Sequence, residues 1–414
     1  MCGSFFILKI FHSTWYNVLT MALSFFGGQK QNESLSLLVD IGSASVGAAL
    51  VLIEKGKAPH IISSVREEIS FQEVLVSSKF LFAMNHAFDK ALKDLQEKTK
   101  TVGNPRNVFC TLSSPWFILK TRELHVDQGS EFEVTENQLE KFINTDIESL
   151  KEELKETLPP EDVRIIEKKI IHIKLNGYEI KNPYKQKTSR IDLTVTVGVS
   201  SAKVIQSIEQ KINNYFHART VHFGAFPVAA FSAIRDIFPN DNNFIFLDIT
   251  GEATDVSRVE NDLLVKTISF PRGKNFFIRQ ISSGFSTIHE EASTLFSMFI
   301  RRELDASREE RVTTIVATAK SEWLTRFEKA LKTVADGGAP PRKIFFTTDT
   351  EIEPIFSEVI SATQTDLLPE GSFDVQYLDQ HIVSRFVSFE PEIMRDPFIV
   401  VEALFAEKIL KQHT

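Results

Sequence analysis

The sequence predicts an α/β protein in which the same hairpin pattern occurs twice, far apart in the chain. An apolar run that ends at Asp40 leads through a short polar turn into a second extended run, LLVDIGSASVGAALVLIE. The same pattern recurs more than 200 residues later, where the run Phe244–Leu247 ends at Asp248 and a turn with Gly251 follows. Apolar runs with strand and helix periods alternate between and after these turns. We therefore expect a β-hairpin at each of the two places, with a short polar turn that can hold a phosphate.

The composition is that of a globular protein with more than one domain. The chain has 414 residues, of which 43% are hydrophobic and 25% charged. A net charge of −8 argues against a nucleic-acid binder. Cys2 and Cys110 form neither a metal-ligand cluster nor a disulfide framework, which indicates a reducing, cytoplasmic compartment. The sequence holds no C-x-x-C, H-E-x-x-H or G-K-S/T motif, which argues against zinc, redox and P-loop chemistry.

The first residues form an apolar segment of their own. Phe5–Phe26 is rich in aromatic and aliphatic residues, and no acidic residue precedes Glu33. Polar interruptions argue against a transmembrane helix, and the absence of a clean cleavage site argues against a signal peptide. We expect an amphipathic interfacial helix joined to the body by the polar linker Gly27–Ser34. The alternative is that translation starts at Met21, so that the residues before it are not native.

The helices and strands expected in the first half follow from the spacing of apolar residues and from the Gly and Pro residues that end them. Leu35–Ile53 predicts the first hairpin, and Ser77–Lys98 predicts a helix that ends before Gly103-Asn104-Pro105. Two short extended runs follow, broken at Ser113-Ser114-Pro115. Thr135 and Gln138 fit a capping box that starts a charged helix reaching to about Leu158. Strands are expected at Val163–Lys174 and Arg190–Val199.

The stretch from Val108 to Gly198 thus predicts strand, helix, strand, strand, and we expect it to form its own α/β lobe. The helix face expected in its core carries Leu139, Phe142, Ile143, Ile147 and Leu150. The elements expected after it are a helix at Ser201–Phe216, a strand at Thr220–Phe223, a helix at Pro227–Phe238, the second hairpin, helices at Ser286–Arg302 and Ser321–Val334, a solvated charged segment at Leu304–Arg311 and a last strand at Lys343–Thr347.

The order of these parts resembles FtsA, the bacterial actin homologue of cell division, over about Leu35 to Leu410. VFCTLSSPWFILKTREL resembles the start of the small SHS2-type domain inserted in that family, and the stretch with Asn182-Pro183 resembles its end. FGAFPVAAFSAI resembles the helix before the second hairpin, and DPFIVVEALFAEKIL resembles the closing helix. PilM, the actin-like scaffold of type IV pilus machines, is a similar alternative.

The resemblance implies an actin-like, ribonuclease H-like two-lobed fold of the actin/Hsp70-type ATPase superfamily. Its parts would be 1–33, the apolar extension and linker; 34–107, the first part of lobe 1; 108–198, the insert; 199–240, the second part of lobe 1; and 241–414, lobe 2.

The resemblance also implies a nucleotide site between the hairpins. A tight turn exposes backbone N–H groups to a phosphate, and glycine lets the backbone approach it. Asp40 and Asp248 would hold a magnesium ion, and Thr347 and Thr348 would lie in the loop beside the adenosine. The phosphate loops would be formed by Asp40, Gly42, Ser43 and Ser45 in the first turn and by Asp248, Gly251, Thr254 and Asp255 in the second.

Several positions depart from the family pattern, however. Thr250 and Glu252 replace two of the three glycines of the second turn, and Glu252 adds a carboxylate where phosphate oxygens are expected. Two like charges about 4 Å apart repel by roughly 1 kcal/mol in water and by several in a protein. Ser293 and Phe296 replace a glutamate and a lysine of the nucleoside-binding helix, and Thr348-Asp349 replaces glycines of the adenosine loop. We expect ATP binding to be weak or lost.

These observations predict a structural protein rather than an enzyme. The leading expectation is a cytoplasmic FtsA-like scaffold in cell division that binds other division proteins. It would assemble with copies of itself through the insert, and Phe5–Phe26 would attach it to the inner face of the membrane. That segment is the membrane candidate because FtsA carries its membrane helix at the C-terminus and this chain stops at Thr414. The alternatives are a PilM-like pilus scaffold, an active ATPase, and a sugar or acetate kinase, against which the insert argues.

Overall fold

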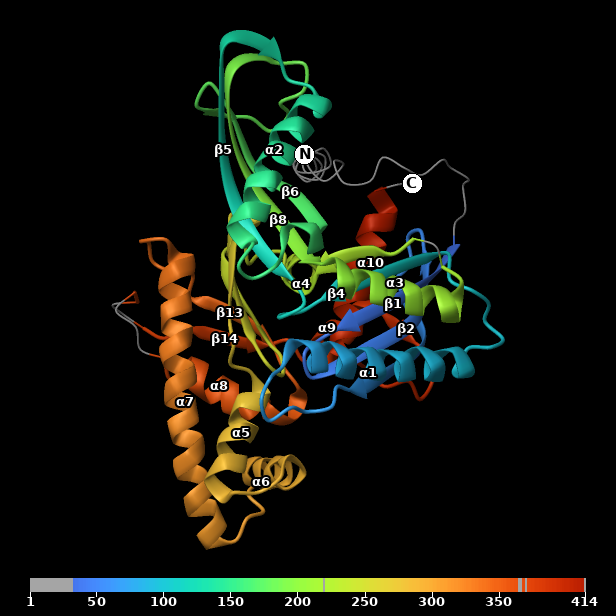
Figure 1. Cartoon of the computed structure of the whole chain (residues 1–414), viewed down its shortest axis with the longest axis vertical. Coiled ribbons are helices and arrows are strands. Elements are labelled where there is room, and N and C mark those ends of the chain that lie inside the picture. The colour runs from blue at the N-terminus through green and yellow to red at the C-terminus, as the bar shows by residue number, and fades with distance from the viewer. Residues whose placement is uncertain (1–32, 219, 364–366, 369–370, 413–414) are drawn as a thin grey trace, which may run out of the picture.

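The computed structural model describes residues 33–218, 220–363, 367–368 and 371–412 (Figure 1). It contains three β-sheets with helices against them. The predicted two-lobed α/β fold is confirmed. The expected interfacial helix at Phe5–Phe26 lies outside the described residues. Within the described part of the chain, no helix is long and apolar enough to cross a membrane.

Lobe 1 is the six-stranded sheet and its helices. The sheet has the order β15-β3-β2-β1-β4-β9. Its strands are β1 (Glu33–Ile41), β2 (Ser45–Glu54), β3 (His60–Glu68), β4 (Asn107–Leu112), β9 (His222–Ala225) and β15 (Ser388–Phe389). Its helices are α1 (Ser77–Lys98), α3 (Ala202–Phe216), α4 (Phe226–Ile237), the short α9 (Gln380–Val383) and α10 (Pro397–Gln412).

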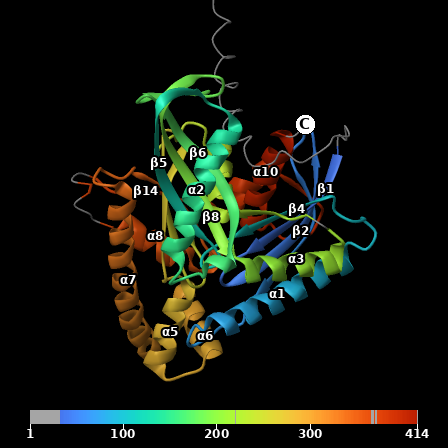
Figure 2. The same cartoon turned by 45° about the horizontal axis from the view of Figure 1, so that its top comes forward.

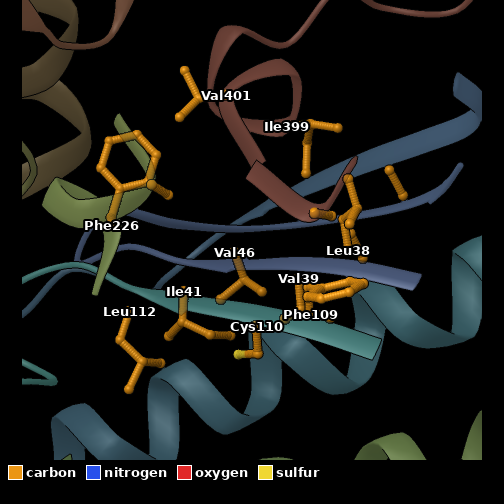
Figure 3. Packing of buried hydrophobic residues seen from close by; sticks show 14 of the residues in the cluster. Leu38, Val39, Ile41, Val46, Phe109, Cys110, Leu112, Phe226, Ile399 and Val401 are labelled. Atoms are coloured by element: carbon orange, nitrogen blue, oxygen red, sulfur yellow. The ribbon is translucent and has the colours of Figure 1, made fainter. Parts of the chain in front are cut away.

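Two layers of helices enclose this sheet. Helix α1 packs on β2, β3 and α3, whereas α10 packs on α4 and on strands β1 and β2. Figure 3 shows Ile399 and Val401 of α10 on one side of the strands, with Cys110 and Leu112 toward the helix on the other. The expectation that 241–414 forms lobe 2 is therefore wrong at its end, because β15 pairs with β3 and α10 covers β1. The buried apolar residues of α10 belong to the core cluster that contains the lobe 1 sheet.

Lobe 2 is the five-stranded sheet, of order β12-β11-β10-β13-β14, and its helices. Its strands are β10 (Phe244–Ile249), β11 (Thr254–Glu260), β12 (Leu263–Phe270), β13 (Lys343–Thr347) and β14 (Asp374–Tyr377). Its helices are α5 (Lys274–Phe285), α6 (His289–Arg301), α7 (Ala306–Ala335) and α8 (Glu353–Ser361). Helix α5 was not predicted, and β13, predicted with the right bounds, is not the last strand.

The charged segment expected at Leu304–Arg311 is largely the first turns of α7. Asp305 caps this helix and accepts a hydrogen bond from the backbone N–H of Arg308. The segment looked like a loop because its charged side chains face solvent. Helical packing shows only farther along, at Val312 and Val316, which are buried.

The insert is the four-stranded sheet β5-β8-β6-β7 and helix α2, at the top of Figure 1. Its elements are β5 (Ile118–Glu133), α2 (Glu136–Leu154), β6 (Val163–Leu175), β7 (Tyr178–Glu179) and β8 (Lys187–Ser201). The predicted capping box at Thr135 and Gln138 is present. Of the predicted core face, Leu139, Ile143, Ile147 and Leu150 are buried and Phe142 is partly buried.

The insert does not begin at Val108 as expected. That residue lies in β4, which pairs with β1 and β9 in the lobe 1 sheet. Helix α2 also ends at Leu154, before the predicted end near Leu158. Figure 2 shows the insert sheet standing next to lobe 2, where Thr121 of β5 donates a hydrogen bond to the carbonyl of Val265 in β12.

Candidate functional site

The turns of the two hairpins touch each other. Ser43 Oγ lies 2.7 Å from Thr250 Oγ1 and accepts a hydrogen bond of 2.9 Å from the backbone N–H of Glu252. Gly251 faces Ala44 so closely that a Cβ at position 251 would lie 2.8 Å from the Ala44 Cβ. The hairpins therefore face each other as the sequence predicted, and the turns are in direct van der Waals and hydrogen-bond contact.

The guanidinium of Arg66 occupies the space beside Asp40. Arg66 lies on β3 and donates to Asp40 Oδ2 at 2.7 Å, to Asp396 Oδ2 at 2.6 Å and to Ser45 Oγ at 2.9 Å. Burial raises the pKa of Asp40, and the Arg66 charge opposes that rise. A Cβ on Gly47 would lie 2.7 Å from the Arg66 Nη2. The absence of a side chain at Gly47 thus leaves room for the guanidinium of Arg66.

The carboxylate of Glu252 points into the site rather than into solvent. It is 7% exposed and accepts a hydrogen bond of 2.7 Å from Asn275 Nδ2. Arg279 donates to both of its oxygens, at 2.8 Å each. Both partners come from α5. The sequence singled out Glu252 as an obstacle to phosphate, and the structure supplies the cation that stabilises it there.

The start of α5 is closed by the second turn. The backbone N–H groups of Lys274 and Asn275 donate to the carbonyls of Thr250 and Gly251, at 2.9 and 2.8 Å. A Cβ on Gly273 would lie 2.1 Å from the Thr250 carbonyl oxygen, so this approach requires glycine. A helix N-terminus is a ready anion site when its N–H groups are free. These two N–H groups already have partners within the chain.

Three buried aspartates surround the turns without forming a metal cluster. Asp248 accepts a hydrogen bond of 2.9 Å from Thr347 Oγ1, and burial, with Asp255 nearby, raises its pKa well above the usual range. Asp255 accepts hydrogen bonds from Ser114 and Ser269, and burial raises its pKa to about 6. Carboxylate oxygens suit Mg²⁺. Of the expected pair Asp40 and Asp248, however, Asp40 already pairs with Arg66 at 2.7 Å. Among the described residues, no group of three or more His, Cys, Asp or Glu could hold a metal by itself.

One oxygen of each of these aspartates has no hydrogen-bond partner among the described groups. They are Oδ1 of Asp40 and Oδ2 of Asp248 and Asp255. A buried, unpaired ionised carboxylate is costly, and such a group shifts its pKa and takes up a proton instead. Burial thus favours the protonated form of Asp248 and Asp255, whereas Asp40 is paired with Arg66.

The side expected to hold the nucleoside is filled by apolar packing. Phe296 is 3% exposed and stacks on Phe277, with ring centroids 5.8 Å apart. Thr347 and Thr348 are each 1% exposed, and the Thr348 carbonyl accepts a hydrogen bond from the Tyr377 hydroxyl at 3.1 Å. Phe296, which stands where the family has a lysine, is thus part of the lobe 2 core.

The remaining expected residues have structural partners. The Gly42 carbonyl accepts from Trp116 Nε1 at 2.7 Å, and Thr254 Oγ1 donates to the Arg272 carbonyl at 2.7 Å. The turn regions bring together Asp40, Gly42, Ser43, Ser45, Asp248, Gly251 and Asp255. Two functional residues, Arg66 and Arg279, carry no signal in the sequence, since each pairs with a carboxylate 26 or 27 positions away in another element.

Comparison with known proteins supports the fold and nothing finer. No family model and no curated protein matches the chain. A chain of a PilM–PilN type IV pilus biogenesis complex matches with a TM-score of 0.62 and 13% identity, over 94% of this chain and 100% of that one. A MamK double helical filament matches with a TM-score of 0.44 and 10% identity, over 91% of this chain and 98% of that one. The ethanolamine utilization protein EutJ from Carboxydothermus hydrogenoformans matches with a TM-score of 0.41 and 13% identity, over 92% of this chain and 91% of that one. The chain therefore has the actin-like ATPase fold.

Proposed function

We propose that this chain is an actin-like scaffold that works through protein contacts rather than through ATP turnover. The observation that supports this most is the direct contact of the two turns, in which Ser43 meets Thr250 and Gly251 meets Ala44. A polyphosphate between the turns would have to separate them. It would also have to displace the Glu252 carboxylate, whose charge repels phosphate oxygens.

A pilus-assembly machine is the setting that we propose first. The likeness to PilM extends over 94% of this chain and the whole of that chain, and that protein was solved in complex with PilN. The corresponding partner of this chain would be another protein of such a machine. Deleting the gene in its host is expected to abolish pili and leave cell length unchanged.

Cell division is the second setting. It is supported by the insert and by the turn at Asn182-Pro183, where the Asn182 side chain accepts a hydrogen bond from the Tyr184 N–H at 3.2 Å. Filamentous cells with normal pili in the same deletion strain would favour this function over the first. Either result is checked by complementation with the gene.

Calorimetry tests the scaffold proposal itself. We expect no detectable binding of ATP with Mg²⁺, because Asp40 is already paired with Arg66 and Glu252 with Arg279. The control is Asp248→Ala, which removes the aspartate that a nucleotide-bound metal would need. Micromolar binding that Asp248→Ala abolishes would overturn the proposal and favour an active ATPase.

Attachment to a membrane through Phe5–Phe26 stays a prediction. Burying several of its bulky side chains among lipid headgroups contributes several kcal/mol, at about 25 cal/mol per Å². The full chain should float with anionic liposomes, and a chain that starts at Glu33 should not. Equal flotation of the two would remove this prediction.

A further inference from the structure

One arginine joins the second turn to lobe 1. Arg279 of α5 holds the Glu252 carboxylate, and its Nε and Nη2 also donate to the Gln72 carbonyl at 3.0 and 2.8 Å. Gln72 lies between β3 and α1, in lobe 1. Figures 1 and 2 both show α5 beside the start of α1. A single guanidinium therefore contacts both lobes and the turn at once.

The residue before Gln72 strengthens this link. The Phe71 ring stacks on His289 of α6, with ring centroids 3.6 Å apart and planes inclined by 10°. The Arg279 guanidinium lies 4.8 Å from the centre of the Phe71 ring. Phe71 packs against the lobe 2 core although it belongs to a lobe 1 segment. Arg279 is thus held by an aromatic face, a carbonyl and a carboxylate, which fixes its position between the lobes.

The arrangement around Glu252 is that of an occupied anion site. Asn275 and Arg279 donate three hydrogen bonds to the two carboxylate oxygens, and the carboxylate is almost completely buried. Guanidinium and amide donors at these distances bind carboxylate and phosphate oxygens alike. In this chain the group that occupies the site is the side chain of Glu252, a residue of the second turn itself.

We propose that Glu252 is the internal occupant of an anion site built by Asn275 and Arg279, and that Arg279 uses this occupied site to hold the lobes closed through Gln72 with no ligand bound. This inference rests on the proposed scaffold function and deepens it. It means that closure is constitutive rather than switched by a nucleotide. It also means that the site accepts a free anion of the pyrophosphate class once Glu252 is removed.

Distance measurement by pulsed electron spin resonance tests the closure. Spin labels on Lys93→Cys in α1 and Lys329→Cys in α7, both exposed positions, report the separation of the lobes in a chain with Cys2→Ser. The remaining thiol, Cys110, is buried. We expect a narrow distance distribution in this chain and a broader one with a longer mean for Arg279→Ala.

The matched control is Arg272→Ala. Arg272 is also an arginine next to the second turn, but it pairs with Glu322 and lies over Phe276, both within lobe 2. Its removal should leave the distance distribution unchanged. If Arg279→Ala does not fold, Arg279→Lys replaces it, because one ammonium cannot hold both Glu252 and Gln72 in the same geometry.

Pyrophosphate tests the anion site. Glu252→Ala should lengthen the distance between the lobes, and inorganic pyrophosphate without metal should restore it and bind at least tenfold more tightly than to the parent chain. Arg279→Ala should not respond. An unchanged distance in Arg279→Ala, or equal pyrophosphate binding by Glu252→Ala and the parent, would overturn the inference. Micromolar binding of ATP with Mg²⁺ by the parent chain would instead overturn the proposed function.

Discussion

At the scale of single residues, Arg66 is the cation on which the first turn depends. It is the partner of two buried carboxylates, Asp40 and Asp396, which come from opposite ends of the chain. Removing one partner of a buried ion pair leaves an uncompensated charge and typically costs about 3–5 kcal/mol. The turn and the C-terminal helix therefore share one determinant of stability.

Arg66→Met is expected to lower the free energy of unfolding by about 3–5 kcal/mol, measured by urea denaturation. The matched control is Lys90→Met, since Lys90 pairs with Glu67 on the surface and is 59% exposed. Surface pairs contribute little, so the control should unfold like the parent chain. Equal losses in the two variants would contradict this account of Arg66.

Glu402 makes stability depend on pH. It is 1% exposed, it accepts a hydrogen bond from Thr111, and burial, with Asp40 nearby, raises its pKa well above the usual value. Because the folded state binds this proton more tightly, the contribution to stability is complete below about pH 4.3 and is lost as the pH rises through the folded pKa.

Glu402→Gln should therefore gain stability relative to the parent chain as the pH rises, and should match it in acid. Glutamine keeps the shape and the acceptor of a protonated glutamate but cannot ionise. Thermal unfolding of both chains across a pH series checks this. A constant difference between them at every pH would show that Glu402 does not titrate in the folded state.

At the scale of elements, the start of α2 is set by local chemistry. Thr135 Oγ1 accepts from the Gln138 N–H, and the Gln138 side chain accepts from the Thr135 N–H. Thr135→Ala should destabilise the insert by about 1 kcal/mol, because it removes the cap. The control is Thr145→Ala, in the exposed middle of the same helix, where alanine is favoured. Hydrogen exchange of the α2 amides measures both, and equal effects would contradict the capping role.

The elements that sequence predicts well are those whose signals are local. The capping box, the bounds of α1 and the two hairpins follow from neighbouring residues. Helix α5 was missed because its buried residues Phe276, Phe277 and Ile278 stand next to one another, and a short apolar run does not distinguish a buried helix from a strand. The closed site could not be predicted, because the contacts of Arg66 and Arg279 depend on how elements far apart in the chain pack. Glu252 was recognised as out of place, yet only the structure identifies its partners.

At the scale of the whole molecule, the C-terminal residues complete lobe 1. Ile399, Val400 and Val401 are fully buried against its core, and Asp396 is one of the two aspartates paired with Arg66. A chain that ends at Arg395 should lose amide protection in β1, β2 and β3 and keep it in β10 and α7. A chain that ends at Gln412, which retains α10, is the control. Uniform loss across both lobes would show that the lobes unfold as one unit.

The return of α10 to lobe 1 also determines when that lobe can be completed during synthesis. The hairpin β1–β2 leaves the ribosome early, but α10, which covers one of its faces, is made more than 340 residues later. At synthesis rates of about 5–20 residues per second, this delay is roughly 20–70 s. During that interval an apolar strand face and Arg66 lack their C-terminal partners. The nascent chain therefore exposes this apolar face until α10 has been made.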